Sequence, residues 1–376
     1  MASKADRARK GSRAGVAGWL TVLAAASGVA LVPAAVLGAG PAQPASAGSP
    51  AARGSQAAPS GNISTVAGGV GGPAKATKVA MIPCGVASAG GSLYVSDLTP
   101  AESTTPGAFA GGAVRKVSPT GRLTTPVGTG ALGPLGDGGL ASKASLRGPS
   151  GVAFDHSGNM VIADTYGSRV RFVAAHTGTF YGQAMKANFI YSVAGIAGQS
   201  GYTGDGIPAT SAELNFPDDV TADGSGNLVI ADTSNNRIRV VAARTGTFYG
   251  QKMQAGDIYS VAGDGTKGFL GDGGPATLAE LNAPRQVAVD GAGNLVMADT
   301  GNNRIRIAAA TNGTFYGRAM KAGHIYTVAG NGKPGFAGDG GPGVSAELNA
   351  PEGVAIDGSG LVIADSLNNR IRMVAG

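Results

Sequence analysis

Cysteine is almost absent from this chain, since Cys84 is the only one among 376 residues. A single cysteine cannot form an intramolecular disulfide, so the fold depends on core packing even in an oxidising compartment. We expect Cys84 to be a small buried hydrophobic residue, and an intermolecular disulfide or a reactive thiol is the alternative. Long apolar runs are absent after residue 47, so no later segment is expected to span a membrane.

The first 47 residues have the composition of a secretory signal peptide. A basic start is followed by an apolar stretch over residues 14–37 and by the small-residue motif Ala45-Ser46-Ala47. We therefore predict cleavage after Ala47 and a secreted, extracellular protein. The alternative is an uncleaved membrane anchor, because the apolar stretch approaches the length of a membrane span.

Little net charge remains outside this segment. The full chain has a formal net charge of +6, and residues 1–47 contain five cations and one aspartate, so +2 remains without them. No basic stripe is left, and the sequence does not indicate nucleic-acid binding. Residues 48–60 have too little apolar content to fold and are predicted to be a flexible linker. Residues 61–376 are predicted to form the folded domain.

One phrase recurs along this domain. It reads ADTYGSRVR, ADTSNNRIR, ADTGNNRIR and ADSLNNRIR at Asp164, Asp232, Asp299 and Asp365, and a weaker copy, VSDL, contains Asp97. The intervals are 66 to 68 residues. This period indicates one supersecondary unit used five times.

Residues 286–330 show the content of one unit. The segments QVAV and LVMAD are joined by the turn DGAGN, RIRIAAA follows the turn TGNN, and IYTVAG comes after a longer insertion. Apolar segments separated by Gly, Asn and Asp turns predict an antiparallel meander of four strands, a to d. Radial repetition of such sheets covers their faces, so the sequence predicts an all-β, five-bladed β-propeller.

The strand count also predicts how the ring closes. Sets of strands a, b and c begin near Val86, Val152, Val220, Val287 and Val354. Residues 62–68, NISTVAG, match the other d strands and precede every set. We predict that they supply strand d of the fifth blade, in a 3+1 closure that removes an open sheet edge.

The repeated phrase and linkers such as GDGGPATLAELNAP at residues 271–284 resemble the NHL repeats of β-propellers. The resemblance covers residues 62–376 and is strongest in the second to fifth units. The first unit departs from it, because a longer loop replaces the tight turn between strands b and c. The resemblance implies a propeller fold.

Positions that are identical in all units are expected to serve the scaffold, as at Asp232, Asn235, Asn236 and Arg237. Positions that differ between units are free to serve a ligand. Directly after the linker proline, each strand a begins with a different pair. The pairs are Cys84-Gly85, Ser150-Gly151, Asp218-Asp219, Arg285-Gln286 and Glu352-Gly353.

If strand a lines the axis, these pairs converge at one mouth of the central channel. The mouth would then be polar and concave, which is typical of a small-ligand site. The predicted ligand-binding residues are Asp218, Asp219, Arg285, Gln286 and Glu352. A water-filled entrance with mutually compensating charges is the alternative.

The insertions between strands c and d carry an aromatic pair in three consecutive units. The pairs are Phe180/Tyr181, Phe248/Tyr249 and Phe315/Tyr316. Exposed and clustered, they would form a partner-binding face opposite the channel mouth. Because the three copies are nearly identical, packing of each insertion onto its own blade is the interpretation we favour.

Metal and catalytic motifs are incomplete. Asp205, Asp272 and Asp339 lie in GDG turns, where calcium is an alternative to a structural role, but each loop offers one carboxylate. The histidines occupy three different repeat positions, so they are not expected to converge on a metal. No set of nucleophile, base and orienting residue is visible.

We therefore predict a secreted, non-catalytic binding module without a cofactor, whose partner is a protein or a small extracellular ligand. The alternative is a propeller enzyme of the lactonase or lyase kind. In that case Asp218, Asp219 and Glu352 would bind a divalent metal at the channel mouth.

Overall fold

Short β-strands joined by glycine-rich turns make up the chain in the computed structural model, which describes residues 81–98, 111–133, 136–358 and 360–375. The predicted signal peptide (1–47), linker (48–60) and closing strand (62–68) lie outside the described residues. No helix among the described residues is long and apolar enough to cross a membrane.

The strands form five blades, as predicted. The a strands are β1 (Pro83–Ala89), β6 (Pro149–Phe154), β13 (Pro217–Ala222), β19 (Pro284–Val289) and β25 (Pro351–Asp357). The b strands are β2 (Ser92–Asp97), β7 (Met160–Asp164), β14 (Leu228–Asp232), β20 (Leu295–Asp299) and β26 (Gly360–Asp365). The c strands are β3 (Ala113–Val117), β8 (Arg169–Val173), β15 (Arg237–Val241), β21 (Arg304–Ala308) and β27 (Arg370–Val374). The described d strands are β4 (Leu123–Val127), β11 (Phe189–Ala194), β18 (Asp257–Ala262) and β24 (Ile325–Ala329).

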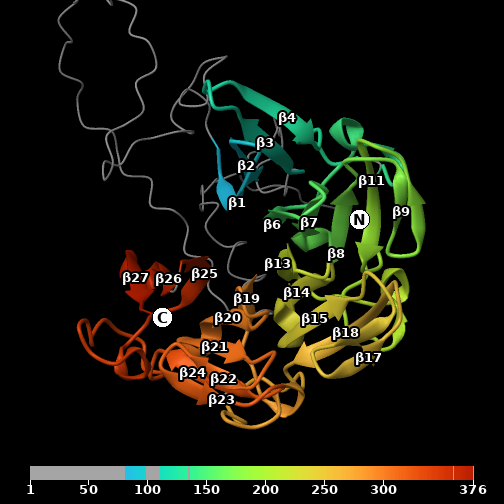
Figure 1. Ribbon diagram of the computed structural model, residues 1–376. Helices are drawn as coiled ribbons and strands as arrows, with labels where there is room; N and C mark the ends of the chain where they lie inside the picture. The colour runs from blue at the N-terminus through green and yellow to red at the C-terminus, as the bar shows by residue number, and fades with distance from the viewer. Residues whose placement is uncertain (1–80, 99–110, 134–135, 359, 376) are drawn as a thin grey trace, which may run out of the picture. The chain divides into compact units, whose positions relative to one another are not determined.

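Each blade is an antiparallel meander in the predicted order a-b-c-d, and the fifth blade has strands a, b and c among the described residues. Two short outer strands, β5 (Gly139–Leu140) and β12 (Ile207–Pro208), extend the second and third blades. Successive a strands contact one another, and they lie nearest the centre of the arc of sheets that runs from β1 to β27 in Figure 1. The start of every a strand is therefore positioned near the axis.

The insertions between strands c and d form separate hairpins. These are β9 (Gly178–Phe180) with β10 (Gln183–Met185), β16 (Gly246–Phe248) with β17 (Gln251–Met253), and β22 (Gly313–Phe315) with β23 (Arg318–Met320). Single turns of 3-10 helix complete the units. In the linkers they are η2 (Ala141–Lys143), η4 (Ala209–Ser211), η6 (Ala276–Leu278) and η8 (Gly343–Ser345), and after strand b they are η3 (Thr165–Gly167), η5 (Thr233–Asn235), η7 (Thr300–Asn302) and η9 (Ser366–Asn368).

The turn between strands b and c explains the repeated phrase. Asn236 has a φ of 52°, in the left-handed region that asparagine tolerates better than most residues. The carboxylate of Asp232 accepts hydrogen bonds from the Asn215 backbone N–H and the Asn235 side chain, both at 2.8 Å. Buried Arg239 lies 3.6 Å from the same carboxylate. These residues thus close the turn and neutralise a buried charge, as a scaffold role requires.

A threonine hydroxyl after strand b joins each inner blade to the next. Thr165 donates to the Pro217 carbonyl at 2.8 Å, and Thr233 donates to the Pro284 carbonyl at 2.7 Å. Thr300 repeats the contact with Pro351 at 2.7 Å. Each bond satisfies a buried carbonyl at the start of the next strand a.

Apolar side chains are buried between adjacent blades but exposed where the first and fifth blades end the described array. Val220 is fully buried in β13, whereas the equivalent Val86 in β1 is 66% exposed. Ile305 and Ile307 are fully buried in β21, whereas their equivalents Ile371 and Met373 in β27 are 70% and 65% exposed. We call these two faces of β1 and β27 the seam.

Candidate functional site

A β-bulge at the start of strand a decides where the variable side chains point. In β13, Pro217 pairs with Asp232 and Asp219 pairs with Ala231, so Asp218 is the extra residue between them. The same register shift occurs after Pro83, Pro284 and Pro351. A bulge re-aims the inserted side chain, so the two members of each variable pair have different surroundings.

The first members of three pairs come together at the channel mouth. Nη1 of Arg285 lies 2.7 Å from Oε1 of Glu352, and its Nε lies 3.7 Å from Oδ2 of Asp218. The Arg285 and Asp218 side chains are each 23% exposed, and Glu352 is 44% exposed. Three consecutive blades thus supply one cation between two carboxylates that remain accessible to solvent.

Burial raises the pKa of Asp218 to about 6. The Arg285 guanidinium opposes this shift, and the Glu352 carboxylate adds to it. Because this pKa is close to neutral, the charge of the mouth changes in mildly acidic solution.

Cys84 also lies at this mouth, and it is exposed, so the expectation of a buried hydrophobic residue is wrong. Desolvation of the thiol and the nearby carboxylates of Asp218 and Asp97 raise its pKa to about 11. A thiol with this pKa is protonated at neutral pH and is a weak nucleophile.

The second members of the pairs turn towards neighbouring blades instead. Oδ2 of Asp219 accepts a hydrogen bond from the Val287 backbone N–H at 3.2 Å, and Oε1 of Gln286 accepts one from Val354 at 2.6 Å. A Cβ atom at Gly151 would collide with the Asp219 carboxylate, so this carboxylate lies between β6 and β19. Of the five predicted residues, the structure therefore brings together Asp218, Arg285 and Glu352, and it uses Asp219 and Gln286 to link blades.

Burial raises the pKa of Asp219 to about 7, while hydrogen bonds from the backbone of Val287 and Val220 oppose the shift. Asp219 is 9% exposed as a whole residue, and it forms no ion pair with a described residue. It is therefore a titratable group inside the scaffold rather than in the mouth.

The carboxylates predicted as metal ligands have other partners. Arg285 stands between Asp218 and Glu352, and Asp219 is bound to backbone amides. The described residues contain no group of three or more His, Cys, Asp or Glu side chains that could hold a metal ion. This arrangement gives no support to the lactonase-like alternative.

The aspartates of the GDG turns form ion pairs with the second arginine of strand c. Asp205 lies 3.2 Å from Arg239, and Asp339 lies 2.6 Å from Arg372. Asp272 lies 3.5 Å from Arg306. A guanidinium therefore neutralises each carboxylate, which favours the structural interpretation over calcium binding.

Two histidines contact backbone carbonyls in different blades. His176 lies 2.9 Å from the Ser157 carbonyl oxygen, and His324 lies 3.0 Å from that of Gly273. Neither contact involves the channel mouth.

The aromatic hairpins pack against the blades through their tyrosines. Tyr181 is 8% exposed, and its hydroxyl donates to the Gly226 carbonyl of the next blade at 2.8 Å. Tyr249 and Tyr316 donate to the a–b turn carboxylates Asp223 and Asp290 at 2.8 and 3.1 Å. Of the phenylalanines, Phe180 packs against Phe172 in a tilted arrangement, with ring centroids 5.2 Å apart. Phe248 and Phe315 are partly buried against apolar clusters of their blades.

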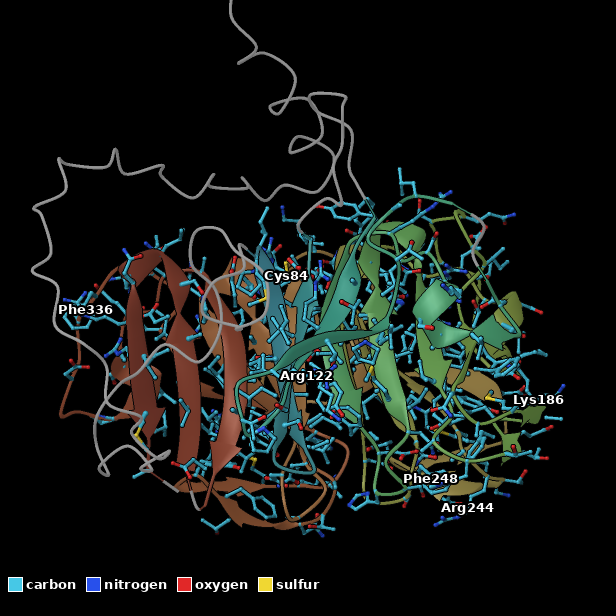
Figure 2. All side chains as sticks on the ribbon, turned by 90° about the horizontal axis from the view of Figure 1, so that it is seen from above. Cys84, Arg122, Lys186, Arg244, Phe248 and Phe336 are labelled. Carbon is cyan, nitrogen blue, oxygen red and sulfur yellow. The ribbon has the colours of Figure 1, made fainter. Side chains whose placement is uncertain are left out.

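Figure 2 shows Cys84 near the upper edge of the ring and Phe248 with Arg244 near the lower edge. The channel mouth and the third hairpin therefore lie at opposite ends of the axis, as the sequence predicted.

A second set of aromatic residues was missed at the sequence level. Tyr202, Phe269 and Phe336 precede the GDG turns, and each ring lies under the first arginine of strand c. The distances from guanidinium carbon to ring centroid are 4.1 Å for Arg237, 3.7 Å for Arg304 and 3.7 Å for Arg370. The recurring pattern of Gly, aromatic residue, any residue and GDG was the available signal, and cation–π contact is its physical content.

Comparison with known families identifies residues 214–241 as an NHL repeat. This segment covers strands a, b and c of the third blade. The resemblance of the repeated phrase to NHL-repeat propellers is confirmed there.

Among curated proteins, the chain is similar to Teneurin-1 of Homo sapiens and of Mus musculus. Each is 27% identical over 260 residues, which are 64% of this chain and 8% of that protein. The chain therefore spans about a twelfth of the length of these relatives.

Similar solved structures include an auxiliary nutrient binding protein from Bacteroides ovatus, with 14% identity and a TM-score of 0.47 over 78% of this chain and 58% of that chain. They also include a streptogramin B lyase, with 13% identity and a TM-score of 0.39 over 78% of this chain and 83% of that chain.

Proposed function

We propose that this NHL-repeat propeller is a secreted, non-catalytic binding module that holds a small polar ligand at the channel mouth. The observation that carries the proposal is the convergence of Asp218, Arg285 and Glu352 from three consecutive blades. This position holds a different residue in every repeat, whereas the proline before each pair and the valine after it are constant.

The mouth offers both kinds of polar group to one ligand. Arg285 supplies guanidinium donors, and Asp218 and Glu352 supply carboxylate acceptors on either side. Because these side chains are partly exposed, a ligand would displace water from them and would not have to break a buried hydrogen-bond network. A molecule that carries an acidic and a basic or hydroxyl group, such as a free amino acid or a sugar acid, matches this pattern of charges.

Substitution at the mouth tests the proposal. A panel of amino acids, sugar acids and neutral monosaccharides is titrated into the protein by calorimetry. We expect a compound that binds the parent protein to lose at least tenfold in affinity with Arg285→Ala or Asp218→Ala. Lys186→Ala is the matched control, because Lys186 is an exposed cation at the outer rim. Equal affinities for the parent and Arg285→Ala would disprove the assignment.

The basic start, apolar stretch and Ala45-Ser46-Ala47 motif support secretion. Mass spectrometry of protein from the culture medium should find a chain that begins at Gly48. Recovery of residues 1–47 with the protein in the membrane fraction would favour the anchor instead.

A further inference from the structure

A cavity of about 540 Å³ lies between the outer parts of the third and fourth blades. Its volume falls in the range of small-molecule sites, roughly 300–1,000 Å³. The third blade and the linker before it supply polar groups, and the fourth blade supplies the apolar wall of Leu295 and Ala308. The polar groups include Tyr202, Asp205, Arg237, Gln251 and Ser260. None of the channel-mouth residues lines this cavity.

Asp205 presents one uncommitted oxygen there. Its Oδ1 accepts hydrogen bonds from Arg239 at 3.2 Å and from the Ser260 hydroxyl at 3.1 Å. No described residue donates a hydrogen bond to its Oδ2, and the side chain is 33% exposed.

The equivalent aspartates of the neighbouring blades have cations at both oxygens. Oδ1 of Asp137 lies 2.7 Å from Arg171, and its Oδ2 lies 3.5 Å from Arg169. Oδ1 of Asp272 lies 3.5 Å from Arg306, and its Oδ2 lies 3.4 Å from Arg318. The third blade therefore lacks the second cation that both neighbours supply.

The fourth blade shows how a guanidinium fits this position. Nη1 of Arg318 donates to the Thr327 carbonyl at 2.8 Å, and its guanidinium carbon lies 5.0 Å from the centre of the Tyr326 ring. Gln251 is the equivalent residue of the third blade, and it donates to the Ser260 carbonyl at 2.8 Å. The third blade retains the carbonyl, a tyrosine at position 259 and the carboxylate, but it has a neutral, shorter side chain.

Arg237 does not replace the missing cation. In the second blade, the equivalent Arg169 faces Asp137, but Arg237 donates to the Asp264 carbonyl and lies over Tyr202. Asp205 and Asp264 are the carboxylates of the cavity lining and Arg237 is its guanidinium, while Arg239 pairs with Oδ1 of Asp205 from outside the lining.

We propose that this cavity is a second binding site, for the guanidinium or alkylammonium group of a small organic cation. The cation forms an ion pair with Oδ2 of Asp205 and occupies the place that the Arg318 guanidinium has in the fourth blade. The apolar remainder of the molecule packs towards Leu295 and Ala308. This site does not depend on the function proposed for the channel mouth.

Ethylguanidinium is a direct probe, and N-ethylurea is its neutral control of similar shape. In an NMR titration of the isotope-labelled protein, ethylguanidinium should shift the backbone amides of Gln251 and Ser260 saturably, and added salt should weaken the effect. N-ethylurea should leave them unshifted. Equal shifts with both compounds would overturn the proposal.

Exchange of the two equivalent residues tests the position of the cation. Gln251→Arg should fill the site and weaken ethylguanidinium binding at least tenfold, and Arg318→Gln should create a new site with shifts at Thr327. Unchanged binding in Gln251→Arg would contradict the proposal. This variant adds a cation, and the arginine can donate to the Ser260 carbonyl as Arg318 donates to that of Thr327.

Asp205→Asn provides a second test, since it removes the charge of the carboxylate. It should weaken binding at least tenfold. Asp339→Asn is the matched control, because Asp339 is also paired with an arginine of strand c through one oxygen. The affinity of this variant for ethylguanidinium, measured at Gln251 and Ser260, should equal that of the parent. Equal binding by Asp205→Asn and the parent would overturn the assignment.

Discussion

Arg285 of the fourth blade and Glu352 of the fifth form an ion pair of 2.7 Å at the start of their a strands. Their exposure keeps the pair solvated, and such pairs contribute little to stability, about 0–1 kcal/mol. The contact therefore orients two charges at the mouth rather than holding the blades together. Burial between blades and the threonine bonds serve that purpose.

Arg285→Ala should raise the pKa of Asp218 above its value of about 6, because the guanidinium lowers that pKa in the native protein. Carboxyl NMR titration measures the shift. Arg285→Lys retains the positive charge and should give a smaller shift. The melting temperature should change little, since exposed polar substitutions usually alter stability by less than about 1 kcal/mol. An unchanged Asp218 pKa in Arg285→Ala would contradict the geometry of the mouth.

Asp219 makes the stability of the protein dependent on pH. Its pKa is raised from 3.8 to about 7 by burial, so its contribution to stability is full below pH 3.8 and is lost as the pH rises through 7. Asp219→Asn removes the charge and retains a carbonyl oxygen that can accept the Val287 hydrogen bond. We expect this variant to melt higher than the parent at pH 8, by about 1–2 °C for each kcal/mol gained in a domain of this size.

The same variant should melt close to the parent at pH 5, where Asp219 is mostly protonated. Asp357→Asn is the control, because Asp357 is an exposed aspartate of β25. A melting difference between parent and Asp219→Asn that does not change from pH 5 to pH 8 would show that Asp219 is not the titrating group.

Tyr181 should matter more to stability than Tyr316. Tyr181 is 8% exposed and contacts two blades, whereas Tyr316 is partly exposed and bonds to a turn of its own blade. We expect Tyr181→Ser to cost about 3–5 kcal/mol, the range for loss of a buried aromatic side chain. Urea denaturation measures the difference in the free energy of unfolding. Tyr181→Phe isolates the part of that difference that is due to the hydroxyl.

A triple Tyr→Ser variant at residues 181, 249 and 316 separates packing from partner binding. We expect it to melt well below the parent. An undiminished melting temperature would contradict the packing interpretation and make the hairpin face the place to search for a partner.

Deletion of residues 61–68 should destabilise the seam. Ile371 and Met373 of β27 are exposed, although their equivalents in the preceding blade are buried, so the fifth blade presents an apolar edge among the described residues. We predict that residues 62–68 pair there as strand d, and that their loss causes aggregation or a markedly lower melting temperature. Deletion of residues 48–60 is the control and should be harmless. A truncated protein that melts like the parent would rule out the 3+1 closure.

The repeats made the blades predictable, because Asp232, Asn235 and Asn236 are determined by local turn geometry and recur at a fixed interval. The channel mouth was predictable in part. The variable pairs marked the right place, but the sequence does not show that a bulge separates Asp218 from Asp219. The direction of each side chain depends on that one-residue shift in register.

The cavity between the third and fourth blades could not have been predicted from the sequence. The exchange of Arg318 for Gln251 is visible when the repeats are aligned. The missing second cation at Asp205 cannot be read from that alignment, because Asp205 and Gln251 are about 50 residues apart in the sequence and come together only in the folded blade. The direction taken by Arg237, away from Asp205, is likewise a property of tertiary packing.

The threonine bonds between blades have a consequence for how such a ring grows. Every inner unit carries its own donor, as at Thr233, and its own acceptor, as at Pro217. A duplicated unit inserted between two others would therefore meet a matching partner on each side without any new mutation. The first and last blades differ, with Leu98 and Ser366 at the threonine position. The threonine bonds are therefore compatible with a ring that gains blades by duplication of internal repeats, while the first and last repeats are kept.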